Sequence, residues 1–211
     1  MHEFANRLKT ELRKGLPGTE VQWLMASSDR RLKDFSRIPG KDVRLAAVLI
    51  LLYPVNGSVH TVFMQRPDYN GVHGGQICFP GGKMESSDAD IHATAVREAN
   101  EETGVPVSMI NIIDSLTPLF ISVSNMLVTP VVGWAERKPE FKHQEDEVVF
   151  LFDAELNRFL DPSIIKVKPM TIHGIPIDVK YYDYEGNVIW GATAMILNEL
   201  LTIIRENGII C

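Results

Sequence analysis

The chain is short of cysteine, of positive charge and of long apolar runs, and each shortage excludes a class of protein. Two cysteines among 211 residues, Cys78 and Cys211, are too few for a disulfide framework and suit a reducing compartment. Lysine and arginine number 21 against 27 acidic residues, so the basic surface typical of a nucleic-acid-binding protein is missing. The longest apolar run, 45–53, is far shorter than a membrane-spanning helix requires.

The first residues, Met1–Phe4, also lack the apolar core of a signal peptide. We therefore expect a cytoplasmic protein that binds neither a membrane nor nucleic acid. A hydrophobic content of 45% with 23% charged residues is typical of a globular chain long enough for one sizeable core. Within such a core, Cys78 is interpreted as a small buried side chain rather than as a nucleophile.

Residues 1–40 are expected to form a helical arm that precedes the main domain, 41–211. A helix is predicted over 2–14, because apolar residues recur there at fourfold spacing: Phe4, Leu8 and Leu12. Glycine and proline at 15–18 end this helix. The arm either packs on the main domain or serves as a contact in a homodimer.

The main domain opens on a run, 43–53, that is apolar enough to predict a strand buried on both faces. Asn56-Gly57 is a strong hairpin signal, and 59–65 is the expected partner strand. Further elements follow along the chain: strands over 110–123, 126–134, 147–152, 166–172 and 177–184, a helical turn over 153–160 and a long helix over 190–206. This order predicts an α/β protein in which helices sandwich a mixed sheet.

Negative charge is densest between Glu85 and Glu102, where six acids stand against one arginine, Arg97. This stretch carries five of the chain's six net negative charges. The segment 88–90 provides a helix N-cap and Gly104 a stop, so a helix is predicted between them. A narrow apolar strip would dock this helix closely on a sheet: Ile91, Ala95 and Ala99.

Three carboxylates share one face of this helix, because Glu98, Glu101 and Glu102 stand at i, i+3 and i+4. They repel one another unless a cation lies among them, and ligands that are all oxygen favour Mg²⁺ or Mn²⁺. Arg97 lies four residues before Glu101 and can hold that carboxylate in place. The simpler alternative is a solvated acidic helix face beside an ordinary glycine loop.

One motif resembles the Nudix box, the signature of hydrolases that cleave a nucleoside diphosphate linked to another group: Gly82, Arg97-Glu98-Ala99, Glu101-Glu102 and Gly104-Val105. Two details depart from the general pattern, since Asp88 replaces its first glutamate and one extra residue separates Asp88 from Arg97. The run 73–82 resembles the coenzyme A pyrophosphatase branch of that family, whose members tend to share the stretched spacing. The later run 189–194 resembles the same branch.

The resemblance implies a Nudix fold, an α/β/α sandwich with a mixed β-sheet. It also implies metal-dependent hydrolysis of coenzyme A or its thioesters to 3′,5′-ADP and (acyl-)4′-phosphopantetheine. The implied ligands of Mg²⁺ or Mn²⁺ are Glu98, Glu101, Glu102 and the carbonyl of Gly82. Glu98 and Glu101 are catalytic in this interpretation, and Glu98 can combine metal ligation with action as a base.

A later loop is expected to add one more catalytic carboxylate, with Glu145, Asp146 and Glu147 as candidates. Glu147 is favoured because the match to the branch aligns best there. The alternative is a solvated loop that precedes a strand. Arg97 and Gly104 are expected to act structurally.

Four residues near the glycines are candidates for binding the substrate: Arg66, His73, Gln76 and Lys83. His73 and Gln76 can touch a phosphate or the adenine, or have structural roles. Arg66 and Lys83 can offset phosphate charge or lie on the surface. Two other functions stay open. One is cleavage of another nucleoside-diphosphate derivative, such as ADP-ribose, NADH or a nucleotide sugar, and the other is a Nudix-fold binding module without catalysis.

Overall fold

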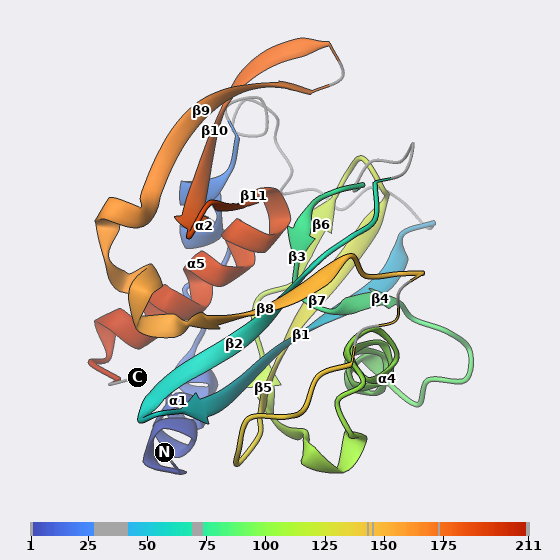
Figure 1. Cartoon of the computed structure of the whole chain (residues 1–211), viewed down its shortest axis with the longest axis vertical. Coiled ribbons are helices and arrows are strands. Elements are labelled where there is room, and N and C mark those ends of the chain that lie inside the picture. The colour runs from blue at the N-terminus through green and yellow to red at the C-terminus, as the bar shows by residue number, and fades with distance from the viewer. Residues whose placement is uncertain are drawn as a thin grey trace.

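A mixed sheet of eight strands forms the centre of the molecule (Figure 1). The computed structural model describes residues 2–27, 42–68, 74–142, 144, 146–172 and 174–209. The strand β1 (Arg44–Val55) pairs in antiparallel with β2 (Ser58–Gln65) and in parallel with β7 (Met126–Trp134). The other strands all pair in antiparallel: β3 (Ile77–Cys78), β4 (Gly81–Lys83), β5 (Asn111–Ser115), β6 (Leu119–Ile121) and β8 (Phe150–Glu155).

The turn between β1 and β2 has the sequence and geometry of a tight hairpin. Asn56 and Gly57 have φ angles of 49° and 94°, and positive φ at both central residues matches the right-handed twist of the flanking strands. The hairpin predicted from Asn-Gly is therefore confirmed.

Both faces of β1 are buried, as its uninterrupted apolar sequence predicts. Successive side chains alternate between two hydrophobic clusters. One cluster receives Ala46, Ile50 and Leu52. The opposite cluster receives Ala47, Leu49, Leu51 and Tyr53. The sheet therefore separates two cores, and each core has its own covering helices.

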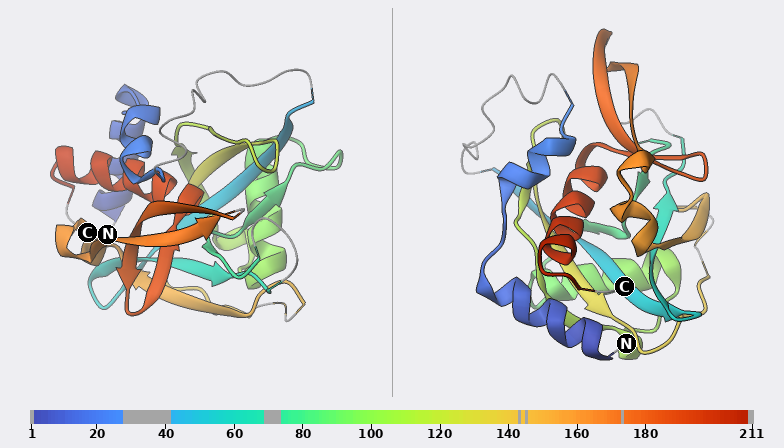
Figure 2. Two further views of the ribbon diagram at one scale, coloured as in Figure 1. Left: turned by 90° about the horizontal axis from the view of Figure 1, so that it is seen from above. Right: turned by 90° about the vertical axis from the view of Figure 1, so that its left-hand side faces the viewer.

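The helix α4 (Ile91–Thr103) covers one face, where its Ala95 and Ala99 pack into the second of these clusters. Helices α1 (His2–Lys14), α2 (Thr19–Gln22) and α5 (Gly191–Glu206) lie on the other side. Figure 2 shows α1 and α5 on one side of the sheet and α4 on the opposite side. The predicted α/β/α sandwich with a mixed sheet is confirmed. In the described part of the chain, no helix has both the length and the hydropathy of a membrane span.

A buried carboxylate connects the N-terminal helices to the rest of the protein. Glu199 of α5 is fully buried and accepts hydrogen bonds from Gln22 Nε2 at 2.8 Å and Thr117 Oγ1 at 2.6 Å. It also accepts from the backbone N–H groups of Gly18 and Thr117, both at 3.2 Å. Four donors satisfy the two oxygens, so burial of this charge is compensated without a cation.

The C-terminal strands form a second, antiparallel sheet that the sequence analysis did not separate from the first. It consists of β9 (Ile165–Ile172), β10 (Ile175–Tyr184) and β11 (Asn187–Trp190). In Figure 1 the hairpin of β9 and β10 projects beyond the main body. Trp190, which was expected to begin the last helix, belongs to β11 and caps α5. The side chain of Thr193 then fixes α5 to β3 by donating to the Ile77 carbonyl at 3.1 Å.

Two predicted strands differ substantially from the observed ones, and the others agree to within two residues at each end. The predicted strand 110–123 is divided into β5 and β6, and 116–118 belong to neither strand although Leu116 N still donates to the Pro130 carbonyl of β7 at 2.8 Å. The predicted strand 147–152 begins later, at Phe150, and continues to Glu155 as β8. Short 3₁₀ turns complete the described elements: η1 (Trp23–Met25), η2 (Val107–Met109), η3 (Leu156–Leu160) and η4 (Pro162–Ile164).

Candidate active site

The acidic helix α4 is bounded by two local signals. The Asp90 side chain accepts a hydrogen bond from Ala93 N at 2.8 Å and caps the N-terminus. Gly104 ends the helix with a φ of 69°, a conformation that glycine adopts at low cost. A Cβ at Gly104 would lie 2.8 Å from the Lys142 carbonyl, so the same glycine admits the loop that carries Glu147.

Asp88 does not cap the helix but binds an arginine on it. Its carboxylate accepts two hydrogen bonds from Arg97, from Nε at 2.8 Å and from Nη2 at 2.9 Å. It also accepts from Glu85 N and Thr94 Oγ1, each at 2.9 Å. The Arg97 guanidinium is the main reason why the pKa of Asp88 is well below its usual range.

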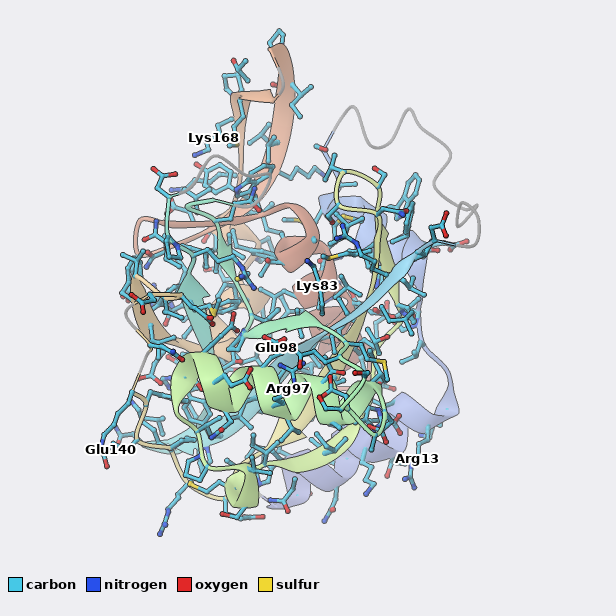
Figure 3. All side chains as sticks on the ribbon, turned by 90° about the vertical axis from the view of Figure 1, so that its right-hand side faces the viewer. Arg13, Lys83, Arg97, Glu98, Glu140 and Lys168 are labelled. Atoms are coloured by element: carbon cyan, nitrogen blue, oxygen red, sulfur yellow. The ribbon has the colours of Figure 1, made fainter. Side chains whose placement is uncertain are left out.

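Arg97 connects Asp88 to two of the carboxylates on α4. Its Nη1 donates to Glu98 Oε1 at 3.0 Å and to Glu101 Oε2 at 2.9 Å. Its Nη2 also donates to the Lys83 carbonyl in β4 at 3.0 Å. Figure 3 shows Arg97 and Glu98 on α4, facing β4. We call Asp88, Arg97, Glu98 and Glu101 the Arg97 cluster.

Glu102 has separate partners, and its side chain is more deeply buried than those of Glu98 and Glu101. Its Oε2 accepts from Gly81 N at 2.7 Å, and its Oε1 lies 3.4 Å from Arg66 Nη2. The same Nη2 donates to the Gly81 carbonyl at 2.7 Å. We call Arg66, Gly81 and Glu102 the Arg66 cluster. This contact is not predictable from local sequence patterns, because the partners of Arg66 lie 15 and 36 residues away.

Gly81 and Gly82 bring β4 close to its neighbours, each against a different one. A Cβ at Gly81 would overlap the backbone of Ala47 and Val48 in β1. A Cβ at Gly82 would lie 2.5 Å from the carboxylate of Glu98. The absence of a side chain at Gly81 therefore allows β4 to pair closely with β1, and its absence at Gly82 allows the carboxylate of Glu98 to lie against β4.

Burial raises the pKa of two of these carboxylates. The pKa of Glu102 rises to about 7, because burial outweighs the opposing effects of Arg66 and the Gly81 N–H. The pKa of Glu98 is also raised by burial, against the effect of Arg97. Two acids on one helix face thus take up a proton more readily than ordinary glutamates.

Glu147 lies on a turn. It is close enough to Glu102 for its negative charge to contribute to the raised pKa of that residue. The turn is held by Val148, which is buried and whose N–H donates to the Gln144 carbonyl at 2.9 Å. Val149 N donates to the Gln65 carbonyl at 2.9 Å, one residue before Arg66. Asp146 is exposed on the same turn. Glu145 lies outside the described residues.

The substrate-binding candidates have different surroundings. Gln76 is half-buried, and its carbonyl accepts from Arg66 N at 3.1 Å. Lys83 is exposed, and in Figure 3 its side chain points away from α4. Arg66 is engaged with Glu102 and Gly81, as described above. His73 lies outside the described residues.

An open cleft of about 610 Å³ lies at a different place, between β8 and the segment 138–141. Apolar side chains form much of its lining, among them Val62, Phe141, Phe150 and Leu151. The acids of α4 are not part of this lining. The cleft is therefore distinct from the carboxylate site.

The donor set around Gly82 suits a hard divalent cation. Carboxylate and carbonyl oxygens are the ligands that Mg²⁺ and Mn²⁺ prefer. Because Gly82 has no Cβ, the carboxylate of Glu98 lies directly against the backbone of β4, and the raised pKa of Glu102 indicates a buried acid with too little positive charge around it. Within the described ranges, the His, Cys, Asp and Glu side chains form no preassembled group of three, because the acids of α4 contact Arg66 and Arg97 instead.

Comparison with known proteins identifies relatives over most of the chain. The family model of the NUDIX domain matches residues 43–163. The uncharacterized Nudix hydrolase NudL of Yersinia pestis is 36% identical over 159 residues, which are 74% of this chain and 78% of NudL. The crystal structure of RenU, a Nudix hydrolase from M. Smegmatis, is similar with a TM-score of 0.55 at 15% identity, over 78% of this chain and 87% of RenU. A MutT/nudix family protein from Enterococcus faecalis gives a TM-score of 0.50 at 12% identity, over 89% of this chain and 73% of that protein.

Proposed function

Because the chain belongs to the Nudix family of hydrolases, which act on pyrophosphate bonds, we propose that it cleaves the pyrophosphate of coenzyme A or its thioesters. The products are 3′,5′-ADP and 4′-phosphopantetheine, or the acylated form of the latter. One observation carries this proposal. The run 73–82, which resembles the coenzyme A branch, ends in two glycines that contact the acids of α4.

In this proposal Glu98, Glu101, Glu102 and the carbonyl of Gly82 hold Mg²⁺ or Mn²⁺. When bound, the metal ion neutralises charge on the pyrophosphate and lowers the pKa of water. Arg97 orients Glu98 and Glu101, because its Nη1 donates to both carboxylates. Asp88 and the Lys83 carbonyl hold the guanidinium in turn.

The reaction adds water to one phosphorus and breaks the bond from that phosphorus to the bridging oxygen. A carboxylate must accept the proton that water loses. Glu98 is one candidate, because its half-buried carboxylate lies directly against Gly82. Glu147 is the other, because it lies on an anchored turn near Glu102.

Groups outside the acidic helix must select the substrate, since a metal ion acts on any pyrophosphate. We propose that Gln76 and His73 serve this role, because they precede the glycine turn by a few residues. Lys83 is a candidate for offsetting phosphate charge at the open side of β4. A binding module without catalysis is disfavoured, because Glu98, Glu101 and Glu102 are all retained.

A screen of coenzyme A, ADP-ribose, NADH and nucleotide sugars with Mg²⁺ or Mn²⁺ tests the substrate, with products identified by mass. We expect coenzyme A to be cleaved with the highest kcat/KM. Gln76→Ala should raise the KM for coenzyme A more than the KM for ADP-ribose, by roughly ten- to a hundredfold if one hydrogen bond to a charged group is lost. A clear preference of the wild type for ADP-ribose would contradict the coenzyme A assignment and leave the hydrolase class intact.

A further inference from the structure

We propose that Arg66 is a positioning residue that acts on the site through Glu102, and that it does not bind the phosphates of the substrate. This inference rests on the proposed function only in taking Glu102 as a metal ligand. It concerns a residue whose cationic side chain, near a glycine turn, otherwise suggests direct contact with phosphate.

Arg66, the backbone of Gly81 and the carboxylate of Glu102 form a closed ring of hydrogen bonds. Its Nη2 donates to the Gly81 carbonyl at 2.7 Å and lies 3.4 Å from Glu102 Oε1. The Gly81 N–H completes the ring by donating to Glu102 Oε2 at 2.7 Å. Both oxygens of Glu102 therefore have a fixed donor, and rotation of the carboxylate would break at least one of these contacts.

The burial of Glu102 makes its carboxylate dependent on the donors in this ring. The side chain of Glu102 is 3% exposed and that of Arg66 is 29% exposed, so water cannot readily replace a lost donor on the carboxylate. Removing one member of a buried charged pair costs far more than removing an exposed one. The guanidinium is thus needed to pair the carboxylate of Glu102 in the protein without substrate.

Arg66 also contacts a third segment near the site. Its side chain forms a hydrogen bond with the thiol of Cys78 in β3, where burial raises the pKa of that thiol to about 11. Arg66 follows β2 directly and therefore connects β2, β3, β4 and α4. A side chain that contacts several elements is suited to holding them in fixed positions relative to one another.

A positioning role and a phosphate-binding role predict different measurements. Loss of a phosphate contact raises the KM for substrate at saturating metal and leaves metal binding unchanged. Loss of the ring around Glu102 weakens metal binding without substrate, and its effect on stability depends on whether residue 102 is a glutamate. The two roles can therefore be separated without relying on turnover alone.

The first experiment measures Mn²⁺ binding to the full chain by electron paramagnetic resonance, without substrate, in Arg66→Met, Arg66→Lys and Lys83→Met. We expect Arg66→Met to weaken Mn²⁺ affinity by about 10- to 100-fold, as loss of an outer partner of a ligand does. Arg66→Lys should be intermediate, because one amine cannot reproduce the fork of a guanidinium. Lys83→Met removes a cation from β4, two residues after Gly81, and leaves the contacts of Glu102 intact. It should change Mn²⁺ affinity by less than about twofold, well below the 10- to 100-fold loss expected for Arg66→Met.

The second experiment is a double-mutant cycle on the melting temperature of the metal-free protein, with Arg66→Met, Glu102→Gln and the double variant. Interacting residues give non-additive effects. We expect Arg66→Met to lower the melting temperature, and to lower it by less than half as much in the Glu102→Gln background. If Arg66→Met does not fold, Arg66→Lys takes its place in the cycle and in the metal titration.

Unchanged Mn²⁺ affinity, additive melting temperatures and a raised KM for coenzyme A would overturn the inference and return Arg66 to the substrate. If the wild type cleaves no nucleoside diphosphate at all, the proposed function fails. The Mn²⁺ titration and the thermal cycle still decide the role of Arg66 in that case.

Discussion

Two arginines hold the acidic helix against the same strand, but they do so in different surroundings. Arg97 donates to the Lys83 carbonyl and Arg66 to the Gly81 carbonyl, and both are residues of β4. Each arginine also pairs with carboxylates of α4. The side chain of Glu101 is 48% exposed, whereas that of Glu102 is 3% exposed. The contact of Arg97 with Glu101 is therefore partly screened by solvent, whereas the carboxylate that Arg66 contacts is shielded from it.

The difference indicates that the two clusters have different roles along α4. In the Arg97 cluster, one guanidinium orients Glu98 and the more exposed Glu101. In the Arg66 cluster, a buried ring fixes Glu102 and the glycine turn together. We therefore expect damage to the Arg97 cluster to affect mainly turnover. Damage to the Arg66 cluster should affect stability and metal affinity as well.

The largest contrast is expected between Gly81 of the Arg66 cluster and the adjacent Gly82, which lies against Glu98 of the Arg97 cluster. Gly81→Ala places a Cβ against the backbone of β1, which cannot move without breaking the pairing of β1 with β4. It should lower the free energy of unfolding by about 3 kcal/mol or more. Gly82→Ala meets only the flexible end of Glu98, so it should fold and lose turnover by about a hundredfold through a displaced carboxylate.

Urea unfolding and steady-state kinetics on both alanine variants measure this contrast. A serine at each position repeats the test with a slightly larger side chain. Comparable losses of stability in the two alanine variants, or full turnover in Gly82→Ala, would show that the two clusters are not separate in function.

The next effect concerns Arg97 itself. Arg97→Met should lower kcat by about 10- to 100-fold, because Glu98 and Glu101 lose the donor that orients them. Arg97→Lys should recover little of this loss, since lysine cannot make the forked contact with Asp88. The measurement is kcat at saturating metal and substrate. A lysine variant with wild-type kcat would show that only the charge matters.

The sequence predicted the Arg97 cluster better than the Arg66 cluster, and the reason is distance along the chain. Asp90 and Gly104 bound α4 through local signals, and the contact of Arg97 with Glu101 follows from helical spacing. Arg66 meets Glu102 only because β2, β4 and α4 come together in the folded sheet. No spacing within one element encodes that contact.

The dependence of sequence prediction on local signals also explains the errors in the predicted elements. β1 and its hairpin were recognised because an apolar run and Asn56-Gly57 are local signals. β11 was missed because four residues before a helix carry too little pattern to be separated from it. The break between β5 and β6 lies opposite Pro130 of β7, a residue far away in sequence that has no N–H to donate to the ladder.

The smallest expected effect is a difference in pH dependence between the clusters, measured on metal-free protein at fixed ionic strength. The pKa of Glu102 is raised to about 7, above an ordinary value of about 4.3. The folded state keeps a proton that the unfolded state releases, so stability should fall as pH rises from about 4.3 to about 7, by at most ~4 kcal/mol. Glu102→Gln should remove this component.

Asp88 should act in the opposite direction and in a lower pH range. Its pKa is lowered in the folded state, so its contribution is present above about 3.9 and is lost as pH falls below that value. Asp88→Asn should remove that acid-sensitive component only. Identical pH profiles for the two variants would contradict the assignment of separate charge environments.

The central claim is that the acids of α4 form the metal site of a pyrophosphatase, and one paired measurement tests it most directly. Mn²⁺ binding and coenzyme A cleavage are followed in the same samples of wild type, Glu101→Gln and Glu102→Gln, at limiting metal and saturating substrate. We predict that cleavage by the wild type requires the metal, and that both variants stay folded while losing Mn²⁺ affinity and most turnover. Wild-type affinity and turnover in both variants would contradict the account.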